Sequence, residues 1–216
     1  CGGHTEITDA VRRPVVTGMM AGTVTRSRLI DKRNMAPGDR VLLTKSIAVE
    51  GTAIIAREFG DRLEKLGMSK SEIDSGRRFL ANISIITEAQ IAAESKATSA
   101  MPDVTEGGLA TALEELGIAG GHRIKSDMDA IPVDAQTRKI CRLVEIDPLG
   151  LLGSGSLLIC CREAGWEDIM AAVRKAGIEI TCIGEVLQPG RGIIAEKDRQ
   201  PAPWPQFETD EITKLF

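Results

Sequence analysis

The stretch SLLICCREAGWEDIMAAVRKAGIEITCIGEVL, residues 156–187, decides the fold class. Its first six residues form an apolar run typical of a buried strand, and residues 178–187 form a second strand-like run. Between them, WEDIMAAVRKA has apolar residues at helical spacing, and Gly177 ends the predicted helix. Strand, helix and strand in this order predict an α/β or α+β layer.

The cysteine pattern indicates thiols packed in the core rather than disulfide bonds or a zinc site. None of the five forms a CxxC pair, and Cys160 and Cys161 are adjacent within the first strand, which would send them to opposite faces. We therefore expect the thiols to act as small core residues in a reducing compartment, without a zinc site or a disulfide framework.

The preceding half of the chain predicts further strands and helices. Strands are expected over residues 15–24 and 41–43, the second after a turn at Pro37-Gly38-Asp39. Apolar spacing and stop signals predict helices over residues 50–66, 69–83, 86–95 and 133–146. Ser69 and Glu72 have the spacing of a capping box. Residues 122–132 alternate in polarity and predict another strand, with His122 exposed in the loop before it.

The stretch MPDVTEGGLATALEELG, residues 101–117, places two glycines at a helix start. Two explanations are open. Gly107 and Gly108 remove Cβ atoms, so the unpaired amides of the first turn can approach an anion closely. Alternatively, Asp103 caps the helix while Glu106 reaches back, and the glycines only allow tight packing.

Composition narrows the range of partners. The chain has 216 residues, 43% of them hydrophobic but only 3% aromatic, with no tyrosine. Few rings and a formal net charge of −4 argue against nucleic-acid binding. No uninterrupted apolar run reaches membrane-spanning length. We expect a cytoplasmic protein that binds neither nucleic acid nor membranes.

Four stretches together resemble one superfamily, the aminoimidazole ribonucleotide (AIR) synthetase-like, or PurM-like, proteins. They are GGHTE (2–6), PGDRVLLTKSIAVEGTAIIA (37–56), DVTEGGLATAL (103–113) and DPLGLLGSGSLLI (147–159). The second and third are most similar to the HypE-like, AIR-synthase-related branch. The resemblance covers nearly the whole chain.

The resemblance implies a fold and a domain division. The fold is an α/β (α+β) two-layer domain with a mixed sheet covered by helices, preceded by the end of an ATP-binding domain. Residues 1–36 would be the end of that N-terminal domain, residues 37–200 the PurM-like C-terminal domain, and residues 201–216 a proline-rich tail with a short helix. The N-terminal domain of such proteins pairs with its twin, so the resemblance implies a homodimer.

The resemblance also implies a site in the cleft between the domains, with ATP and Mg²⁺ as cofactors. Asp103 and His4 are the implied catalytic residues, and Asp103 also the implied magnesium ligand. The residues implied to contact ATP or phosphate are Gly2, Gly3, Thr5, Glu6, Thr105, Gly107 and Gly108. Lys45, Ser46 and Glu50 would face a small-molecule or protein-bound substrate, although Ser46 also suits a helix cap and Glu50 a first-turn charge. The GSGS turn at residues 153–156 is expected to be structural.

The implied activity is ATP-dependent activation of a substrate oxygen or nucleophile by phosphoryl transfer, which relies on positioning and charge neutralisation. HypE proteins end in a cysteine, whereas this sequence ends in ETDEITKLF. The broader ATP-dependent class is therefore the prediction, with hydrogenase expression/formation as one member of it. The alternative is a non-catalytic nucleotide-binding or regulatory protein on the same fold.

Overall fold

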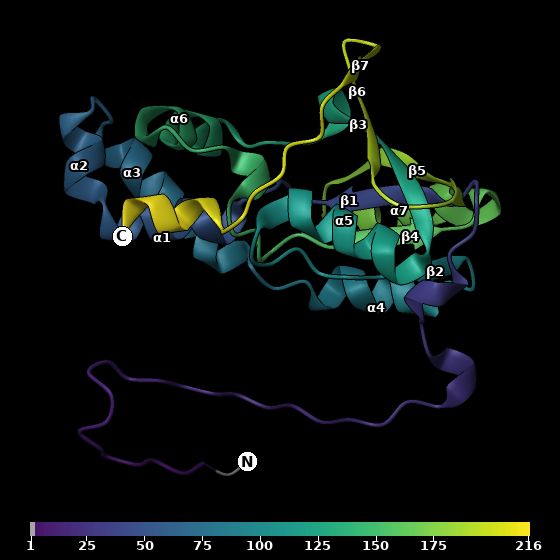
Figure 1. Ribbon diagram of the computed structural model, residues 1–216, viewed down its shortest axis with the longest axis horizontal. Helices are drawn as coiled ribbons and strands as arrows, with labels where there is room; N and C mark the ends of the chain where they lie inside the picture. The colour runs from purple at the N-terminus through teal and green to yellow at the C-terminus, as the bar shows by residue number, and fades with distance from the viewer. Residues whose placement is uncertain (1–2) are drawn as a thin grey trace.

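The computed structural model describes residues 3–216 as a packed body and an extended N-terminal segment (Figure 1). Residues 3–24 contain no helix or strand, and their side chains are exposed. The strand predicted over residues 15–24 is therefore wrong in this structure. These residues have no neighbouring strand to accept and donate backbone hydrogen bonds, and apolar side chains such as Val16, Met19 and Met20 are more than nine-tenths exposed.

The body alternates helices and strands, as the sequence predicts. Its α-helices are α1 (Val49–Glu58), α2 (Gly60–Lys65), α3 (Lys70–Arg77), α4 (Ile86–Glu94), α5 (Gly108–Gly120), α6 (Ala135–Val144) and α7 (Trp166–Lys175). Its strands are β1 (Arg40–Thr44), β2 (Thr98–Ala100), β3 (His122–Asp127), β4 (Leu158–Cys161), β5 (Ile180–Pro189), β6 (Ile193–Lys197) and β7 (Gln200–Ala202). Short 3₁₀ turns include Arg78–Asn82, Pro148–Gly150 and Glu211–Leu215.

The strands form one mixed sheet in the order β2-β4-β1-β5-β3-β6-β7. Only β3 and β6 pair in parallel, and the other pairs are antiparallel. Leu42 of β1 pairs with Ile159 of β4 on one side and with Cys182 of β5 on the other, and the register with β5 shifts between Val41 and Leu42. The mixed sheet covered by helices confirms the predicted fold class. The strands β2, β6 and β7 were not predicted, because three to five residues carry too little alternation to stand out.

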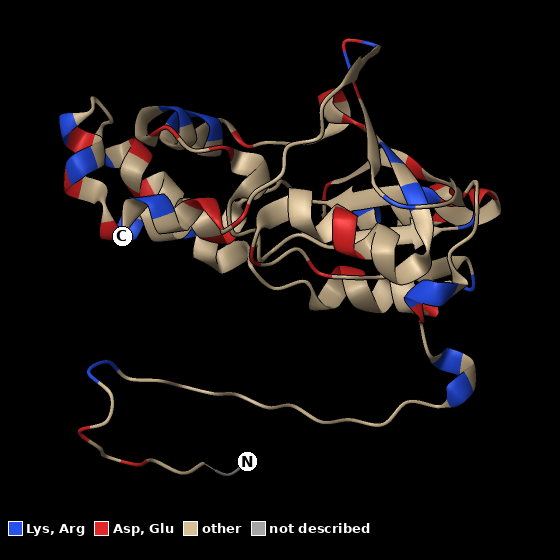
Figure 2. Cartoon of the chain, viewed as in Figure 1, with Lys and Arg blue, Asp and Glu red and all other residues tan. Residues whose placement is uncertain are grey.

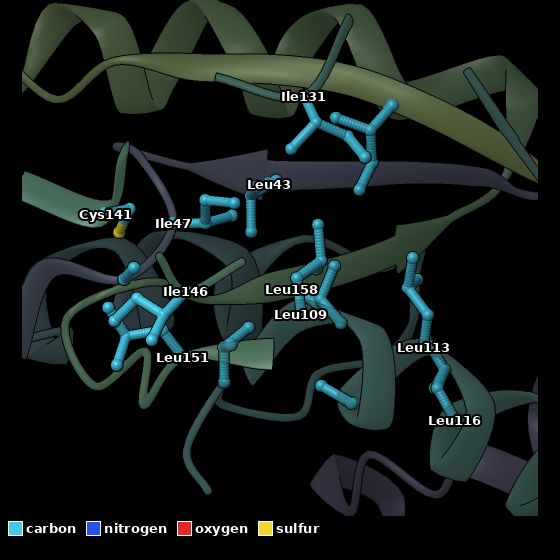
Figure 3. Close-up of a cluster of buried hydrophobic side chains, with 14 of the residues drawn as sticks. Leu43, Ile47, Leu109, Leu113, Leu116, Ile131, Cys141, Ile146, Leu151 and Leu158 are labelled. Atoms are coloured by element: carbon cyan, nitrogen blue, oxygen red, sulfur yellow. The ribbon is translucent and has the colours of Figure 1, made fainter. Parts of the chain in front are cut away.

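Two hydrophobic clusters lie on opposite faces of the sheet. The larger joins β1 to α1, α5 and α6 through residues that include Leu43, Leu113 and Cys141 (Figure 3). The smaller joins β1 and β4 to α7 through residues that include Leu42 and Val173. Both clusters remove apolar surface from water, and each Å² removed stabilises the fold by about 25 cal/mol. This burial holds the helices against the sheet.

Cys160 and Cys161 belong to different clusters, which confirms that adjacent strand residues face opposite ways. Both are buried, and burial raises the pKa of the Cys161 and Cys141 thiols to about 12. These thiols are therefore protonated at neutral pH and pack as small apolar side chains, as predicted.

The helix predicted over residues 50–66 is divided. In a continuous helix the Ala56 carbonyl would accept from the Gly60 amide, but it accepts from Arg77 Nε at 3.1 Å instead. Gly60 also lies against the Arg77 guanidinium, where a Cβ atom would come within 2.6 Å of it. Packing of α3 against α1 therefore ends α1 at Glu58, and α2 restarts at Gly60.

The turn at residues 36–39 joins the N-terminal segment to the sheet. Gly38 has the positive φ of 88° that the predicted turn requires. Asp39 is 2% exposed, and its carboxylate accepts from Arg162 Nη1 at 2.7 Å and from Ser99 Oγ at 2.6 Å. Because a buried carboxylate without partners is costly, this pairing fixes the start of β1 against β2 and β4.

Residues 203–216, the C-terminal strap, fold back over α5 and end beside α1 (Figure 1). Trp204 Nε1 donates to the Ala110 carbonyl at 3.4 Å, and the Phe216 ring lies 5.1 Å from Phe59. In Figure 2, Lys and Arg are mixed with Asp and Glu over the helices, so the side in view has no single sign of charge. Among residues 3–216, no helix is both long and apolar enough to span a membrane.

Candidate functional site

The start of α5 has the backbone that its two glycines suggest. Gly107 and Gly108 both adopt left-handed conformations, with φ of 74° and 62°. A Cβ atom on Gly108 would lie 2.5 Å from the Leu149 carbonyl oxygen and 2.7 Å from that of Leu151. The glycines therefore allow two backbone segments to approach each other, which confirms the packing part of the second explanation.

The cap of α5 comes from a residue that the sequence analysis did not consider. Asp210, in the C-terminal strap, accepts from the Gly107 amide at 2.8 Å and from the Leu152 amide at 3.2 Å. Asp103 is exposed, and its backbone forms an isolated bridge with Leu157. The prediction that Asp103 caps α5 with Glu106 is therefore wrong: the N-cap is Gly107, and a carboxylate far along the chain supplies the acceptor.

Several amides at this helix start are still without an acceptor in the described chain. The Gly108 amide donates to the Thr105 carbonyl at 3.1 Å, whereas those of Thr105, Glu106 and Leu109 donate to no backbone or side-chain group of residues 3–216. Such amides, at the positive end of the helix dipole, attract anions. The side chains around them are polar: Asp103 and Glu106 are exposed and Thr105 is half-buried.

Three of the four stretches that carry the family resemblance meet at this point. The Gly153 amide donates to the Thr105 carbonyl at 3.2 Å, and the Val104 amide donates to the Ser156 carbonyl at 3.2 Å. Ser156 Oγ in turn donates to the Ser46 carbonyl at 2.6 Å. We call this junction of residues 44–52, 103–108 and 147–156 the three-loop node. Its hydrogen bonds confirm that the GSGS turn is structural.

The loop after β1 carries two of the predicted substrate-facing residues, Lys45 and Ser46, which line a groove of about 770 Å³. Lys45 has a positive φ of 56°, uncommon for a residue with a side chain. Its Nζ contacts Glu88 Oε1 at 2.8 Å and donates to the Ser84 carbonyl at 2.7 Å and the Asn82 carbonyl at 3.1 Å. All three ammonium hydrogens therefore have an acceptor within the protein.

Glu50 fits the alternative given for it, whereas the helix cap of α1 differs from the one predicted. Glu50 lies in the first turn of α1, as its alternative explanation proposes, and does not line the groove. The N-cap of α1 is Ala48, which has a φ of 59°, so Ser46 is not the cap. Thr52, on the next turn, is buried and donates to the Ala48 carbonyl at 2.7 Å.

The GGHTE stretch is not brought to the three-loop node in this structure. Gly3, Thr5 and Glu6 lie in the exposed N-terminal segment, and within residues 3–216 the hydrogen-bond partner of His4 Nε2 is Glu6, at 2.9 Å. Gly2 lies outside the described residues. The second histidine, His122, begins β3 rather than preceding it in an exposed loop. It is half-buried, with Nδ1 3.0 Å from the Leu187 carbonyl oxygen, which corrects the prediction.

Few side chains near the three-loop node could bind a divalent cation. Within residues 3–216, no group of three His, Cys, Asp or Glu side chains is placed to hold a metal ion. Asp103 is exposed, and no side-chain hydrogen bond occupies its carboxylate. Because Mg²⁺ commonly binds through one or two carboxylates together with phosphate oxygens and water, Asp103 fits one ligand of such an ion but not a complete protein site.

Two site residues were missed by sequence reasoning, Asp210 and Glu88. Glu88 is 1% exposed although it lies in the first turn of α4, where a charge is ordinarily solvated. Its pairing with Lys45 joins residues on different elements, so no local pattern indicates it. For Asp210, the only local signal is the Asp-x-Ile spacing that caps the short 3₁₀ turn, where the Ile212 amide donates to it at 2.9 Å.

Comparison with protein families places these loops in a known context. Residues 36–197 match the family described as AIR synthase related protein, C-terminal domain. The carbamoyl dehydratase HypE of Cupriavidus necator is 33% identical over 181 residues, which is 83% of this chain and 49% of that protein. The chain therefore spans about half the length of this relative.

Solved structures show the same fold at lower identity. The crystal structure of Escherichia coli HypE superposes with a TM-score of 0.66 and 22% identity, over 84% of this chain and 54% of that chain. A HypE structure in complex with ATP gives a TM-score of 0.65 and 18% identity, over 88% of this chain and 56% of that one. These likenesses show a shared fold.

Proposed function

Because the chain belongs to the AIR synthase related family and has its C-terminal domain, we propose that it is the C-terminal part of an ATP-dependent enzyme of that family. The observation that carries the proposal is the three-loop node, where α5 begins with amides that have no acceptor in the described chain. Amides of this kind stabilise phosphoryl oxygens. The ATP complex of a HypE protein supports the choice of nucleotide.

In this proposal, the α5 start binds phosphoryl oxygens through the amides of Thr105, Glu106 and Leu109. The left-handed Gly107 and Gly108 set the backbone path that presents these amides. Asp210 already occupies the Gly107 amide, so a phosphate would bind beside that carboxylate or replace it. The Thr105 hydroxyl has no partner in the described chain and is free to donate to the same oxygens.

Asp103 is the proposed catalytic and magnesium-binding carboxylate, since it is exposed next to these amides. Mg-ATP, when bound, would supply the phosphoryl group that converts a poor leaving oxygen into a good one, as a dehydration or a kinase reaction requires. The residues His4, Gly2, Gly3, Thr5 and Glu6 are proposed nucleotide contacts from the N-terminal part. Of these, Gly3, His4, Thr5 and Glu6 would have to approach the node from the exposed segment in which they lie here.

Among the proposed substrate-facing residues, Ser46 is the most suitable. Its hydroxyl has no partner in the described chain and it lines the groove, whereas the Lys45 ammonium is fully paired. Lys45 would then shape the loop rather than bind the substrate directly. Glu50 does not line the groove and would act on a substrate only from the rim of the node.

The exposed apolar residues of the N-terminal segment support the proposed domain division. Ile7, Val16, Met19 and Met20 are each more than nine-tenths exposed. A row of such residues on an extended segment is costly in water and is typical of a strand that pairs elsewhere. We propose that residues 1–36 complete an ATP-binding domain and that this domain forms a homodimer.

The test is ATP hydrolysis with and without Mg²⁺ by the wild-type protein and by Asp103→Asn. We expect turnover that requires Mg²⁺ and that the substitution lowers at least about tenfold, because the charged carboxylate that would bind the metal ion is lost. Circular dichroism should show an unchanged fold. Equal turnover by the variant would reject the catalytic assignment of Asp103.

A non-catalytic nucleotide-binding protein is the second candidate, favoured by the occupation of the Gly107 amide by Asp210. It predicts that ATP binds without being hydrolysed, whatever substrate is added. Isothermal titration with ATP, run beside the hydrolysis assay, separates the two.

A further inference from the structure

The groove beside the three-loop node has chemistry that the proposed phosphate site does not use. Its volume is about 770 Å³, within the range of small-molecule sites. Four segments form its walls: residues 45–46, 81–88, 129–134 with Arg138, and 177–181. We propose that this groove binds a small organic cation, an amine or amidinium on an apolar stem, with Glu88 as its anchoring carboxylate.

The groove is held open by backbone bonds rather than by flexible side chains. The Lys45 amide donates to the Glu179 carbonyl at 2.7 Å, and the Ile47 amide donates to the Pro132 carbonyl at 3.0 Å. These bonds tie the loop after β1 to two opposite walls. They also hold Lys45 and Ala48 in left-handed conformations, with φ of 56° and 59°, which a free loop would leave. The cavity is therefore preformed.

Glu88 is the observation that points to a ligand. The side chain is 1% exposed, and its Oε1 lies 2.8 Å from Lys45 Nζ and 3.4 Å from Thr44 Oγ1. Its Oε2 accepts no hydrogen bond from any group of residues 3–216, although the residue lines the groove. Glu88 Oε2 is not among the fully buried unpaired atoms of the described chain, which are Ser126 Oγ and Gln136 Oε1, so it can accept a hydrogen bond from a donor that enters the groove.

The charges of the groove favour a cationic donor. Lys45 and Glu88 neutralise each other, and of the remaining charged residues three are acidic, Asp129, Asp134 and Glu179, while only Arg138 is basic. Two of these carboxylates each accept a hydrogen bond from a backbone amide through one oxygen, Asp129 from Asp198 and Asp134 from Gln136. Glu179 is exposed and has no side-chain partner in the described chain. The excess of negative charge raises the local concentration of cations.

The rest of the lining decides which cation fits. Ile131, Pro132, Val133 and Ile178 present apolar surface next to the carboxylates, and the hydroxyls of Ser84 and Thr87 stand beside them. Within residues 3–216, no group of three metal-ligating side chains exists, so a bare metal ion does not suit the groove. An apolar stem against these residues and a charged end on Glu88 use both parts of the lining.

The experiment is calorimetric titration of the chain with benzamidine and with benzamide, which has nearly the same shape but no charge. We expect benzamidine to bind at least about tenfold more tightly, because a charge-assisted hydrogen bond to a buried carboxylate discriminates strongly. Equal binding of the two probes, or no binding of benzamidine, would overturn the proposal.

Variants locate the site. Glu88→Gln should raise the Kd for benzamidine about tenfold and Glu179→Gln about threefold, whereas Glu58→Gln, an exposed acid outside the groove, should leave it unchanged. Glu88→Gln could fail to fold because Lys45 loses its carboxylate partner. In that case, the comparison of benzamidine with benzamide and the effect of Glu179→Gln still test whether the groove binds a cation. Equal effects of Glu179→Gln and Glu58→Gln would contradict the assignment. The inference goes beyond the proposed function and needs no ATP, so its failure leaves the phosphate site untouched.

Discussion

The helices α3 and α5 begin in different ways. At α3, the Ser69 side chain accepts from the Glu72 amide at 3.3 Å, and Glu72 Oε2 accepts from the Ser69 amide at 2.9 Å. Both partners lie within one turn of each other. At α5, the N-cap is Gly107, which has no side chain, and its amide donates to Asp210, 103 residues further along the chain.

The difference decides what each helix start can stabilise. The capping box of α3 needs only its own residues, so its contribution is local. The cap of α5 joins the three-loop node to the C-terminal strap, since the same Asp210 carboxylate also accepts from Leu152 and Ile212. Loss of the α5 cap should therefore destabilise the three-loop node and the C-terminal strap as well as the helix, whereas loss of the α3 cap should destabilise only that helix.

The largest effect is expected from Gly108→Ala. A Cβ atom there would lie 2.5 to 2.9 Å from backbone atoms of Leu149 and Leu151, and the residue has a φ of 62°. We expect a loss of unfolding free energy of more than about 3 kcal/mol, because backbone cannot move aside as a flexible side chain can. Urea unfolding followed by circular dichroism measures it.

Gly177→Ala is the matched control for this substitution. Gly177 also has a positive φ, of 78°, but nothing lies within 4 Å of the added Cβ atom. Its cost should be about 1 kcal/mol, the conformational penalty alone. Equal losses for the two variants would mean that close approach of the 149–151 backbone does not constrain the α5 start.

Asp210→Ala should have the second largest effect. The substitution removes the acceptor for the amides of Gly107, Leu152 and Ile212. We expect a loss of about 2 kcal/mol, since charge-assisted bonds are stronger than neutral ones and at least one donor is partly buried. Hydrogen exchange should accelerate at both the strap and the start of α5. Exchange that changes in the strap alone would contradict a shared cap, and Glu208→Ala, an exposed acid of the same strap, is the control.

The α3 box makes a prediction about pH. A hydrogen bond from Lys139 and bonds from Ser69 lower the pKa of Glu72 from 4.5 to about 2. Because the folded-state pKa lies below the unfolded value, the stabilisation is fully present above about pH 4.5 and is lost as the pH falls toward 2. The difference in melting temperature between wild type and Glu72→Gln should therefore shrink over this range.

The contribution of Glu72 should remain small and salt-dependent, because the Lys139 and Glu72 side chains are each 32% exposed. Glu58→Gln, which changes an exposed acid without a salt-bridge partner, serves as the control across the same pH range. A difference that stays constant between pH 6 and pH 2 would contradict the ionic origin of this part of the cap.

The comparison also shows how much of the fold the sequence can predict. Ser69 with Glu72, the turn at Gly38 and the helix end at Gly177 depend on neighbouring residues, and each is predicted correctly. The break between α1 and α2 depends on Arg77 reaching Ala56 from another helix. Short strands such as β7 depend on the partner strand β6. Neither kind of feature has a local pattern.

The same distinction applies to the candidate site. The glycines of α5 are visible in the sequence because glycine permits backbone conformations that other residues rarely adopt, whereas the loop with Lys45 was indicated only by the family resemblance. Their partners Asp210 and Glu88 are ordinary acids in the sequence, and only the fold brings them to the helix start and into the groove. The convergence of three motif stretches was predictable from the family resemblance, while the hydrogen bonds that join them were not.

The smallest effect on stability is expected from Asp103→Ala, and it separates the two explanations for the α5 start most clearly. If Asp103 were the cap, its loss would cost about 1 kcal/mol. In the structure it is exposed and its side chain makes no hydrogen bond within residues 3–216, so the unfolding free energy should change by less than about 0.5 kcal/mol. Ser69→Ala, which removes an observed cap, should cost about 1 kcal/mol in the same urea titration. A conspicuous polar residue that is neutral for folding, placed beside amides without acceptors, is explained more readily by a ligand than by the fold. A loss at Asp103 equal to that at Ser69 would return it to a structural role and remove the main support for its catalytic assignment.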